Sequence, residues 1–308
     1  MITVLIQMSG LILCGILWRL FKPAGLTGNQ TRLVLTQVVY FLFLPALVLS
    51  VLWQAKLGAN SVKYSILGAS SIIFGAVIIW GINRFIRMAR RQLGAILLAT
   101  AFPNVTYLGL PVLEKTFGSW ARSVAIQIDL FAGLPLLLTV GILVARHYGD
   151  SGSAEKLPLL ALFRVPALAV GLVAVALNLV GIAMPLWLDG WLNLLVPVVI
   201  PLMLFSLGLG LEWSAMRWRN LPSIMPVIAI KLFVMPLFAL MVARSIGLEG
   251  DFLTASVLEM AMPSMVLGIV LCDRYGLDTS LYAMAVTTTT LLSLVTLPLW
   301  YDWLVVWQ

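Results

Sequence analysis

The sequence is poor in charged residues, which make up 10% of its 308 positions, whereas hydrophobic residues make up 62%. A soluble domain is about 25% charged and about 45–50% apolar. So few charges cannot cover a surface that faces water, which excludes an ordinary cytosolic enzyme, a nucleic-acid-binding module and a disordered chain. The net charge of +7 does not change this, because the basic residues form no patch interleaved with stacking aromatics.

Cysteine and histidine are scarce as well. Cys14 and Cys272 lie far apart in apolar segments, so they form neither a disulfide framework nor a metal-ligand spacing. His147 is the only histidine, which excludes a Ser-His-Asp triad and multi-histidine metal sites. No nucleophile–base pair stands at helical spacing and no Walker or GxGxxG motif is present, so we expect neither an enzyme nor ATP-driven chemistry.

Long apolar runs are the main positive feature. A bilayer core about 30 Å thick requires about 20 apolar residues per spanning helix. The sequence therefore predicts an all-α polytopic membrane protein, and its eleven tryptophans fall near segment ends or in loops, as an aromatic belt would. The ten predicted segments are 3–21, 31–53, 62–83, 92–117, 121–145, 158–181, 187–211, 221–246, 252–273 and 279–303.

The basic residues are divided unevenly between the two sides of this arrangement. Twelve Lys and Arg fall on the side of the first, third, fifth, seventh and ninth loops, and five on the opposite side; Arg164 and Lys231 lie within segments. Cytoplasmic loops carry the excess of positive charge. We therefore predict a protein of the inner or plasma membrane with both termini non-cytoplasmic. The first segment has no positive n-region and is interpreted as a retained helix rather than a signal peptide.

An internal repeat is indicated by the prolines. The longest polar connection, the predicted cytoplasmic linker 147–157, separates two five-helix halves, 1–146 and 158–308. Because five is odd, a repeat of this size must be inverted in the membrane, as in many secondary transporters. Chance recurrence of a residue common in membrane helices is the alternative. The prolines that correspond, at offsets of 156, 160 and 163 residues, are Pro45 with Pro201, Pro103 with Pro263, and Pro135 with Pro298.

The fourth and ninth segments carry the candidate site. Each has a proline near its middle, followed by a polar residue: Pro103-Asn104 in the fourth and Pro263-Ser264 in the ninth. Proline removes a backbone donor and clashes with the carbonyl four residues back. Two kinked helices are one interpretation. The other is two broken helices that cross, whose second halves present N-terminal N–H groups to an anion. The equivalent places of the two segments in the repeat favour the second.

Charged residues inside the segments are the next signal, because each costs about 2.5–3.5 kcal/mol at a helix centre. Lys231 lies near the middle of the eighth segment, Glu259 lies one turn before Pro263, and Asp129 lies within the fifth segment. Lys231 could pair structurally with Glu259 or with carbonyls of a broken helix, or it could act in transport. Arg164 is expected to snorkel, with its charged end extended to the membrane interface.

The run Thr287–Thr290 could line a polar path or bond to its own helix. The glycines of Ser206–Glu212 favour close helix packing over phosphate binding.

At these residues the chain resembles the auxin efflux carrier family in its short bacterial form. The resemblance covers nearly the whole chain and rests on the Pro103-Asn104 break, GLP at Gly109–Pro111, MPS at Met262–Ser264 and KLFVMP at Lys231–Pro236. It implies two inverted five-helix repeats with broken, crossed helices 4 and 9. It also implies scaffold and transport domains, each built from both repeats, that work as an elevator. The implied activity is secondary transport of organic anions, including auxin in plants and malate or malonate in bacteria.

A more distant likeness is to the bile acid:sodium symporters. PNVTYL at Pro103–Leu108 is similar to their fourth-helix crossover, and Glu259 followed by Met262 is similar to their sodium site. Pro263 stands where those proteins use a side-chain oxygen ligand, so their full sodium coordination does not carry over.

We therefore expect a carrier of a small mono- or dicarboxylate that works by alternating access. Asn104, Thr106 and Ser264, with the backbone at Pro103 and Pro263, would hold the substrate. Glu259 and Asp129 would bind a coupling proton or sodium ion, and Lys231 would balance charge at the crossover. The expected partners are this anion, the coupling ion and the lipid bilayer, with no nucleic acid and no cofactor other than a sodium ion at Glu259; a homodimer is left open. A membrane receptor on a carrier fold is the alternative, and it would predict an appended soluble domain.

A topology prediction follows from the twelve-to-five division of basic residues. A cysteine reporter placed in 147–157 should be labelled only from the cytoplasmic face. Labelling of that reporter from outside intact cells would overturn the orientation.

Overall fold

The structure is a computed structural model that describes residues 2–150, 165–216 and 218–307. Its regular structure there is helical, and the only extended pairing in these ranges is a single antiparallel bridge between Pro103 and Ser264. Most of the predicted linker 147–157 and Arg164 lie outside the described residues. The preceding helix, α9 (Ile142–Tyr148), extends two residues into that predicted linker.

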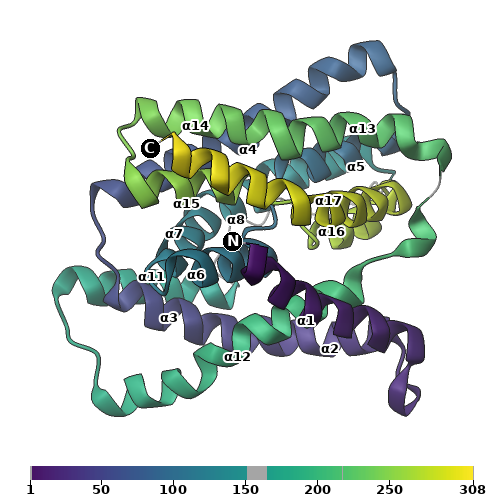
Figure 1. The fold of residues 1–308 in the computed structure, drawn as a ribbon. Coiled ribbons are helices and arrows are strands. Elements are labelled where there is room, and N and C mark those ends of the chain that lie inside the picture. Colours follow the sequence, from purple (N-terminus) through teal and green to yellow (C-terminus); the bar gives the residue numbers. More distant parts are fainter. Residues whose placement is uncertain (1, 151–164, 217, 308) are drawn as a thin grey trace.

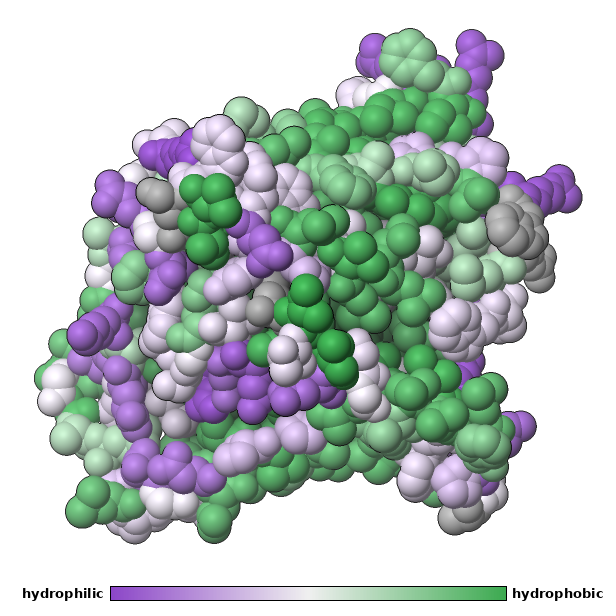
Figure 2. Space-filling model, in the orientation of Figure 1, coloured by the Kyte–Doolittle hydropathy of each residue, from purple (hydrophilic) through white to green (hydrophobic). Residues whose placement is uncertain are grey.

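Seven helical stretches in the described part are long and apolar enough to cross a membrane. They correspond to seven of the ten predicted segments, and the helix α11 (Pro166–Val180) covers the described part of an eighth. Broad apolar areas lie on the face drawn in Figure 2, with hydrophilic side chains projecting at its edges and a further hydrophilic group within the face. The seven stretches are Ile2–Phe21, Gly28–Gln54, Ala59–Ile86, Ala121–Tyr148, Leu186–Ala215, Leu221–Ser245 and Thr279–Val306.

The two remaining predicted segments are each split in two. The fourth consists of α5 (Arg90–Ala101), a short π-helical turn η3 (Val105–Gly109) and α6 (Leu110–Phe117). The ninth consists of α15 (Gly250–Met260) and α16 (Gly268–Tyr275). The interruptions predicted at Pro103-Asn104 and Pro263-Ser264 are therefore present.

Proline also explains a recurrent irregularity within the helices. Four π-helical turns each end two residues before a proline, because widening the helix accommodates the missing N–H and the bulky ring. The turns are η2 (Val39–Phe43) before Pro45, η3 before Pro111, η4 (Asp129–Gly133) before Pro135 and η8 (Ile230–Val234) before Pro236. Thr106, Asp129 and Lys231 all lie on such turns.

The helices pack as two bundles that mix residues from both halves of the chain (Figure 1). The small bundle contains α1 (Ile2–Phe21), α2 (Gly28–Val38) with α3 (Leu44–Gln54), α11 and α12 (Leu186–Gly210). The large bundle contains the remaining helices, including both broken segments. Its other members are α4 (Ala59–Ile86), α7 (Ala121–Ile128), α8 (Leu134–Leu136), α9, α13 (Leu221–Ala229), α14 (Met235–Ser245) and α17 (Thr279–Val306).

Contacts between loops divide the molecule into two ends. Arg91 donates to the Gly276 carbonyl at 2.5 Å and pairs with Asp150 at 3.0 Å, which joins the third, fifth and ninth loops. At the other end Trp53 donates to the Ile182 carbonyl at 2.7 Å, which joins the second and sixth loops. We call the first end the odd-loop face and the second the even-loop face. The predicted basic excess belongs to the odd-loop face.

Glycines bring α1 and α12 into backbone contact within the small bundle. A Cβ built on Gly208 would overlap the Ile12 carbonyl oxygen, and one built on Gly15 would overlap the Phe205 carbonyl oxygen. Small residues allow such close approach between membrane helices. The glycine-rich stretch Ser206–Glu212 therefore serves packing in part, as its composition predicted.

Gly208→Ala should destabilise the protein by about 1–3 kcal/mol, because the added methyl group forces α1 and α12 apart. Gly190→Ala on the same helix is the matched control, since a Cβ there meets no atom within 4 Å. That control should be neutral or slightly stabilising, because Ala favours a helix over Gly by roughly 0.5–1 kcal/mol. Thermal unfolding of the purified protein in detergent measures both. Equal stability of the two variants would contradict the close contact.

Candidate functional site

The two helix breaks are joined to each other through their backbones. The Asn104 N–H donates to the Pro263 carbonyl at 2.8 Å, and the Met265 N–H donates to the Phe102 carbonyl at 3.0 Å. Each break exposes backbone groups that its own helix cannot pair, and each supplies partners for the other. The pairing fixes the side chains of both polar residues, Asn104 and Ser264, at one place inside the large bundle.

Three buried side chains at this place retain polar atoms without partners. Asn104 is 1% exposed, and Glu259 and Ser264 are 0% exposed. Among the described residues, the Asn104 amide nitrogen, the Ser264 hydroxyl and both Glu259 carboxylate oxygens have no hydrogen-bond partner. A buried unpaired polar group costs about 1–3 kcal/mol, and more if it is charged. Such a cluster is expected where the protein binds a polar ligand.

Two carboxylates flank the turn η3 that follows the first break. The Glu259 carboxylate packs against Gly109, where an added Cβ would overlap it, so glycine is needed for this approach. On the same turn the Thr106 hydroxyl donates to the Asp129 carboxylate. Glu259 and Asp129 interact electrostatically. Two nearby carboxylates repel each other when both are ionised.

The Thr106–Asp129 pair faces the boundary between the bundles. A cavity of about 10 Å³ lies at this boundary, which is room for about one water molecule. Leu44, Val48 and Ala167 of the small bundle line it opposite Thr106 and Asp129. Thr106 is thus within one turn of Asn104 and also borders the small bundle.

The threonine run in α17 bonds to its own helix, as one of the two interpretations predicted, and it also accepts hydrogen bonds from other segments. Thr289 accepts from the Ser264 N–H at 3.1 Å and donates to the Ala285 carbonyl of its own helix at 2.7 Å. Thr287 accepts from the Glu212 N–H at 3.1 Å, which links the two bundles. One threonine thus supports the second break and another reaches the bundle boundary.

Tyr282 is a site residue that sequence reasoning missed. Its hydroxyl donates to the Met265 carbonyl at 2.6 Å and lies against Gly268, the first residue of α16. The start of α16, expected to offer free N–H groups to an anion, is therefore covered by this hydroxyl. No local pattern marks Tyr282 in the sequence, because its role depends on the packing of α17 against α16.

Lys231 is fully buried within the large bundle but does not pair with Glu259. Its ammonium group contacts the Met235 sulfur at 3.3 Å, and no ion pair with Glu259 is formed in the described part of the chain. The Met235 methyl group lies 3.6 Å from a Cβ built on Gly75 of α4. The same Cβ would also contact the Thr100 carbonyl oxygen near the end of α5. Lys231 and Glu259 are both fully buried in the protein. The turn η8, which carries Lys231, contacts α5, the first half of the interrupted fourth segment.

These features define a multi-pass membrane transporter: apolar helices that span the bilayer, and a buried polar site built where two of them are interrupted. The chain is matched over residues 2–301 by the family described as membrane transport protein, and it belongs to this family, the auxin efflux carriers. It is accordingly a transporter and not an enzyme.

Similar proteins are transporters from archaea and bacteria. A transporter of Methanothermobacter thermautotrophicus is 30% identical over 288 residues, 91% of this chain and 92% of that protein. A transporter of Methanocaldococcus jannaschii is 26% identical over 299 residues, which are 94% of this chain and 94% of that protein. The transporter YfdV of Escherichia coli is 24% identical over 72% of this chain and 71% of its own.

Replacing Lys231 by methionine should leave the protein as stable as the wild type or more stable. A buried ammonium beside a thioether has lost its hydration without gaining an equivalent partner, and an apolar side chain of similar length avoids that cost. Lys63→Met is the control, because half-buried Lys63 donates to the Gly247 carbonyl at 2.6 Å and should give no gain. Thermal unfolding in detergent measures both variants. A loss above about 2 kcal/mol in Lys231→Met would indicate a buried polar partner for the ammonium.

Proposed function

We propose that the protein is a secondary active carrier of a small organic anion, a mono- or dicarboxylate of the malate, malonate or auxin type. It would work by alternating access and be driven by a proton or sodium gradient across the inner or plasma membrane. The observation that carries this proposal is the cluster of unpartnered buried groups on Asn104, Ser264 and Glu259 where the two breaks meet.

The substrate would lie at the breaks. The Asn104 amide nitrogen and the Ser264 hydroxyl are hydrogen-bond donors suited to carboxylate oxygens, and Thr106 lies one turn further at the bundle boundary. The backbone at Pro103 and Pro263 shapes this place. Because Tyr282 covers the start of α16, side-chain donors carry more of the binding than half-helix N-termini.

The coupling ion would bind at Glu259, with Asp129 close to it. A proton or a sodium ion on Glu259 would relieve the repulsion between the two carboxylates, and it would also remove the repulsion between Glu259 and an incoming anion. Glu259 fits a sodium ion in that its carboxylate has no competing partner in the described part of the chain. The order is therefore ion first and substrate second. Lys231 would balance charge within the large bundle from a distance and not by direct contact.

The architecture would be an inverted repeat of five helices, 1–146 and 158–308, with helices 4 and 9 broken and crossed. The regular proline offsets and the equivalent positions of the two breaks support this. The small bundle would be the scaffold and the large bundle the transport domain, moving as an elevator. The odd-loop face would be cytoplasmic, which leaves both termini outside.

Uptake into proteoliposomes of a panel of carboxylates, with sodium and pH gradients imposed separately, tests the function. Asn104→Ala should weaken substrate binding by about tenfold at any ion concentration, the size of one hydrogen bond to a charged group. Glu259→Gln should instead abolish the dependence of uptake on the ion gradient. Asn193→Ala and Glu249→Gln, exposed residues of the same types, are the controls and should behave as wild type.

Two results would contradict the proposed function or the roles assigned to its residues. If the purified protein binds no carboxylate from a broad panel yet moves a cationic or neutral solute with Asn104 replaced, the anion assignment is wrong. Identical effects of the Asn104 and Glu259 variants on the ion dependence would contradict the separate roles of the two residues.

A further inference from the structure

Arg32 occupies an unusual position on the odd-loop side of the breaks. It lies on α2 of the small bundle, and its guanidinium group rests on Gly210, the buried last residue of α12, with Nη1 3.3 Å from a Cβ built there. An arginine near the end of a membrane helix usually extends outward to the interface. The guanidinium of Arg32 instead turns inward, toward the boundary between the bundles.

The neighbours of Arg32 come from both bundles. It interacts electrostatically with Tyr107, which lies on the turn η3 directly after Asn104, and with Glu212 beyond the end of α12. The Tyr107 hydroxyl interacts with Thr36, whose own hydroxyl is 3.1 Å from that of Ser206. A line of polar groups therefore runs from the first break along the bundle boundary to the odd-loop face.

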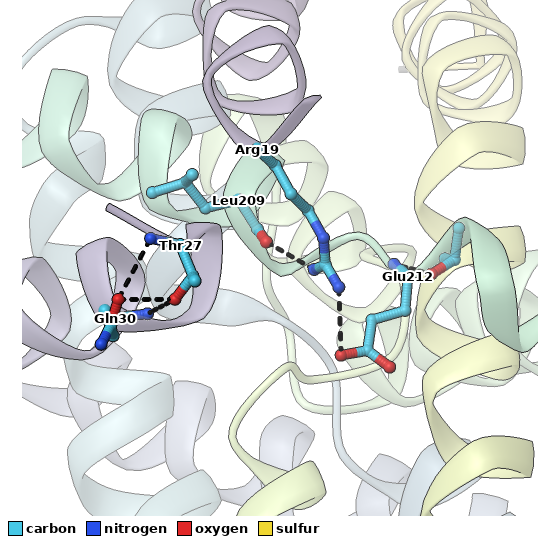
Figure 3. Close-up of polar contacts among 6 residues, drawn as sticks. Arg19, Thr27, Gln30, Leu209 and Glu212 are labelled. Carbon is cyan, nitrogen blue, oxygen red and sulfur yellow. Dashed lines mark hydrogen bonds and ion pairs between the residues drawn. The ribbon is translucent and has the colours of Figure 1, made fainter. Parts of the chain in front are cut away.

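The neighbouring arginine is held differently. Arg19 donates to the Leu209 carbonyl at 2.8 Å and lies 3.6 Å from the Glu212 carboxylate, as Figure 3 shows. Within the described residues, the guanidinium group of Arg32 forms no hydrogen bond and no ion pair. Arg19 is thus fixed by its partners, whereas the planar donor groups of Arg32 are available to a ligand.

We propose that Arg32, flanked by Tyr107 and Thr36, is a second binding subsite for the carboxylate of the substrate, between the breaks and the odd-loop face. This inference rests on the proposed function, because it adds a step to the path of the same anion. A guanidinium group binds a carboxylate with two parallel hydrogen bonds, so it suits an anion that enters along this boundary.

Glu212 has a distinct role in this arrangement. Its carboxylate interacts with both Arg19 and Arg32, and its backbone N–H donates to the Thr287 hydroxyl of the large bundle. A fixed negative charge beside Arg32 competes with an incoming anion for the same positive field. Removing that charge should therefore strengthen binding at the subsite, whereas removing Arg32 should weaken it.

The experiment measures the substrate concentration dependence of transport from each face separately, in right-side-out and inside-out membrane vesicles. Arg32→Gln should raise KM for the carboxylate from the odd-loop face by about tenfold or more and leave KM from the even-loop face within about twofold. Arg32→Lys should give a smaller increase, because it keeps the charge and loses the paired donors. Glu212→Gln should lower KM from the odd-loop face.

Arg87→Gln is the matched control. Arg87 is exposed on the same face, away from the boundary, and its loss removes the same formal charge. KM should be unchanged in that variant. If Arg32→Gln fails to fold, judged by thermal unfolding and gel filtration, Arg32→Lys carries the test with the same expected direction.

An unchanged KM from the odd-loop face in Arg32→Gln would overturn the subsite while leaving carboxylate transport by the wild type intact. Equal losses from both faces, with Glu212→Gln impaired in the same direction, would assign these residues a structural role and also overturn the subsite. Absence of any carboxylate transport by the wild type would instead overturn the proposed function, and the subsite with it.

Discussion

The backbone pairing between the two interrupted helices is the constraint on which the rest of the structure depends. In hydrocarbon there is no water to pair with a free N–H or carbonyl, and each unsatisfied group costs several kcal/mol. A single break at Pro103 or Pro263 would therefore be expensive. Two breaks that exchange bonds between Asn104 and Pro263, and between Met265 and Phe102, satisfy each other. The breaks must then lie together, and the residues that follow them are brought to one place.

Once the backbone is satisfied in this way, the unpaired polarity remains in the side chains. Asn104, Ser264 and Glu259 are buried without partners, while the threonines of α17 and the hydroxyl of Tyr282 support the backbone around them. Glycine determines how close the carboxylate approaches: Glu259 lies against Gly109 because no Cβ intervenes. A bonded backbone surrounded by unpartnered polar side chains is the arrangement that the proposed binding site requires.

Much of the fold and part of the candidate site were predictable from the sequence, because the length of an apolar run and the position of a proline are local signals. The spans, the two interruptions and the burial of Lys231 and Glu259 follow from them. The separation of Lys231 from Glu259, the contact of Tyr282 with Gly268 and the inward turn of Arg32 do not. Each depends on which helix packs against which, and on the direction of a long side chain, neither of which periodicity or composition encodes. The pairing of Thr106 with Asp129 is intermediate: both residues were singled out, but not their contact.

The division of the polar residues between the two bundles bears on how coupling could work under the proposed mechanism. Asn104, Ser264, Glu259 and Asp129 all belong to the large bundle, so their mutual distances are kept if that bundle moves as one body. The order of ion and substrate is then a property of the large bundle alone. Arg32 belongs to the small bundle, and its distance from Asn104 would change with the same movement. A ligand shifts a conformational equilibrium only by its difference in affinity between the two states. Under this proposal, contacts of the substrate with Arg32 would be made in one arrangement of the bundles and lost in the other, and so would supply that difference, whereas contacts within the large bundle would not.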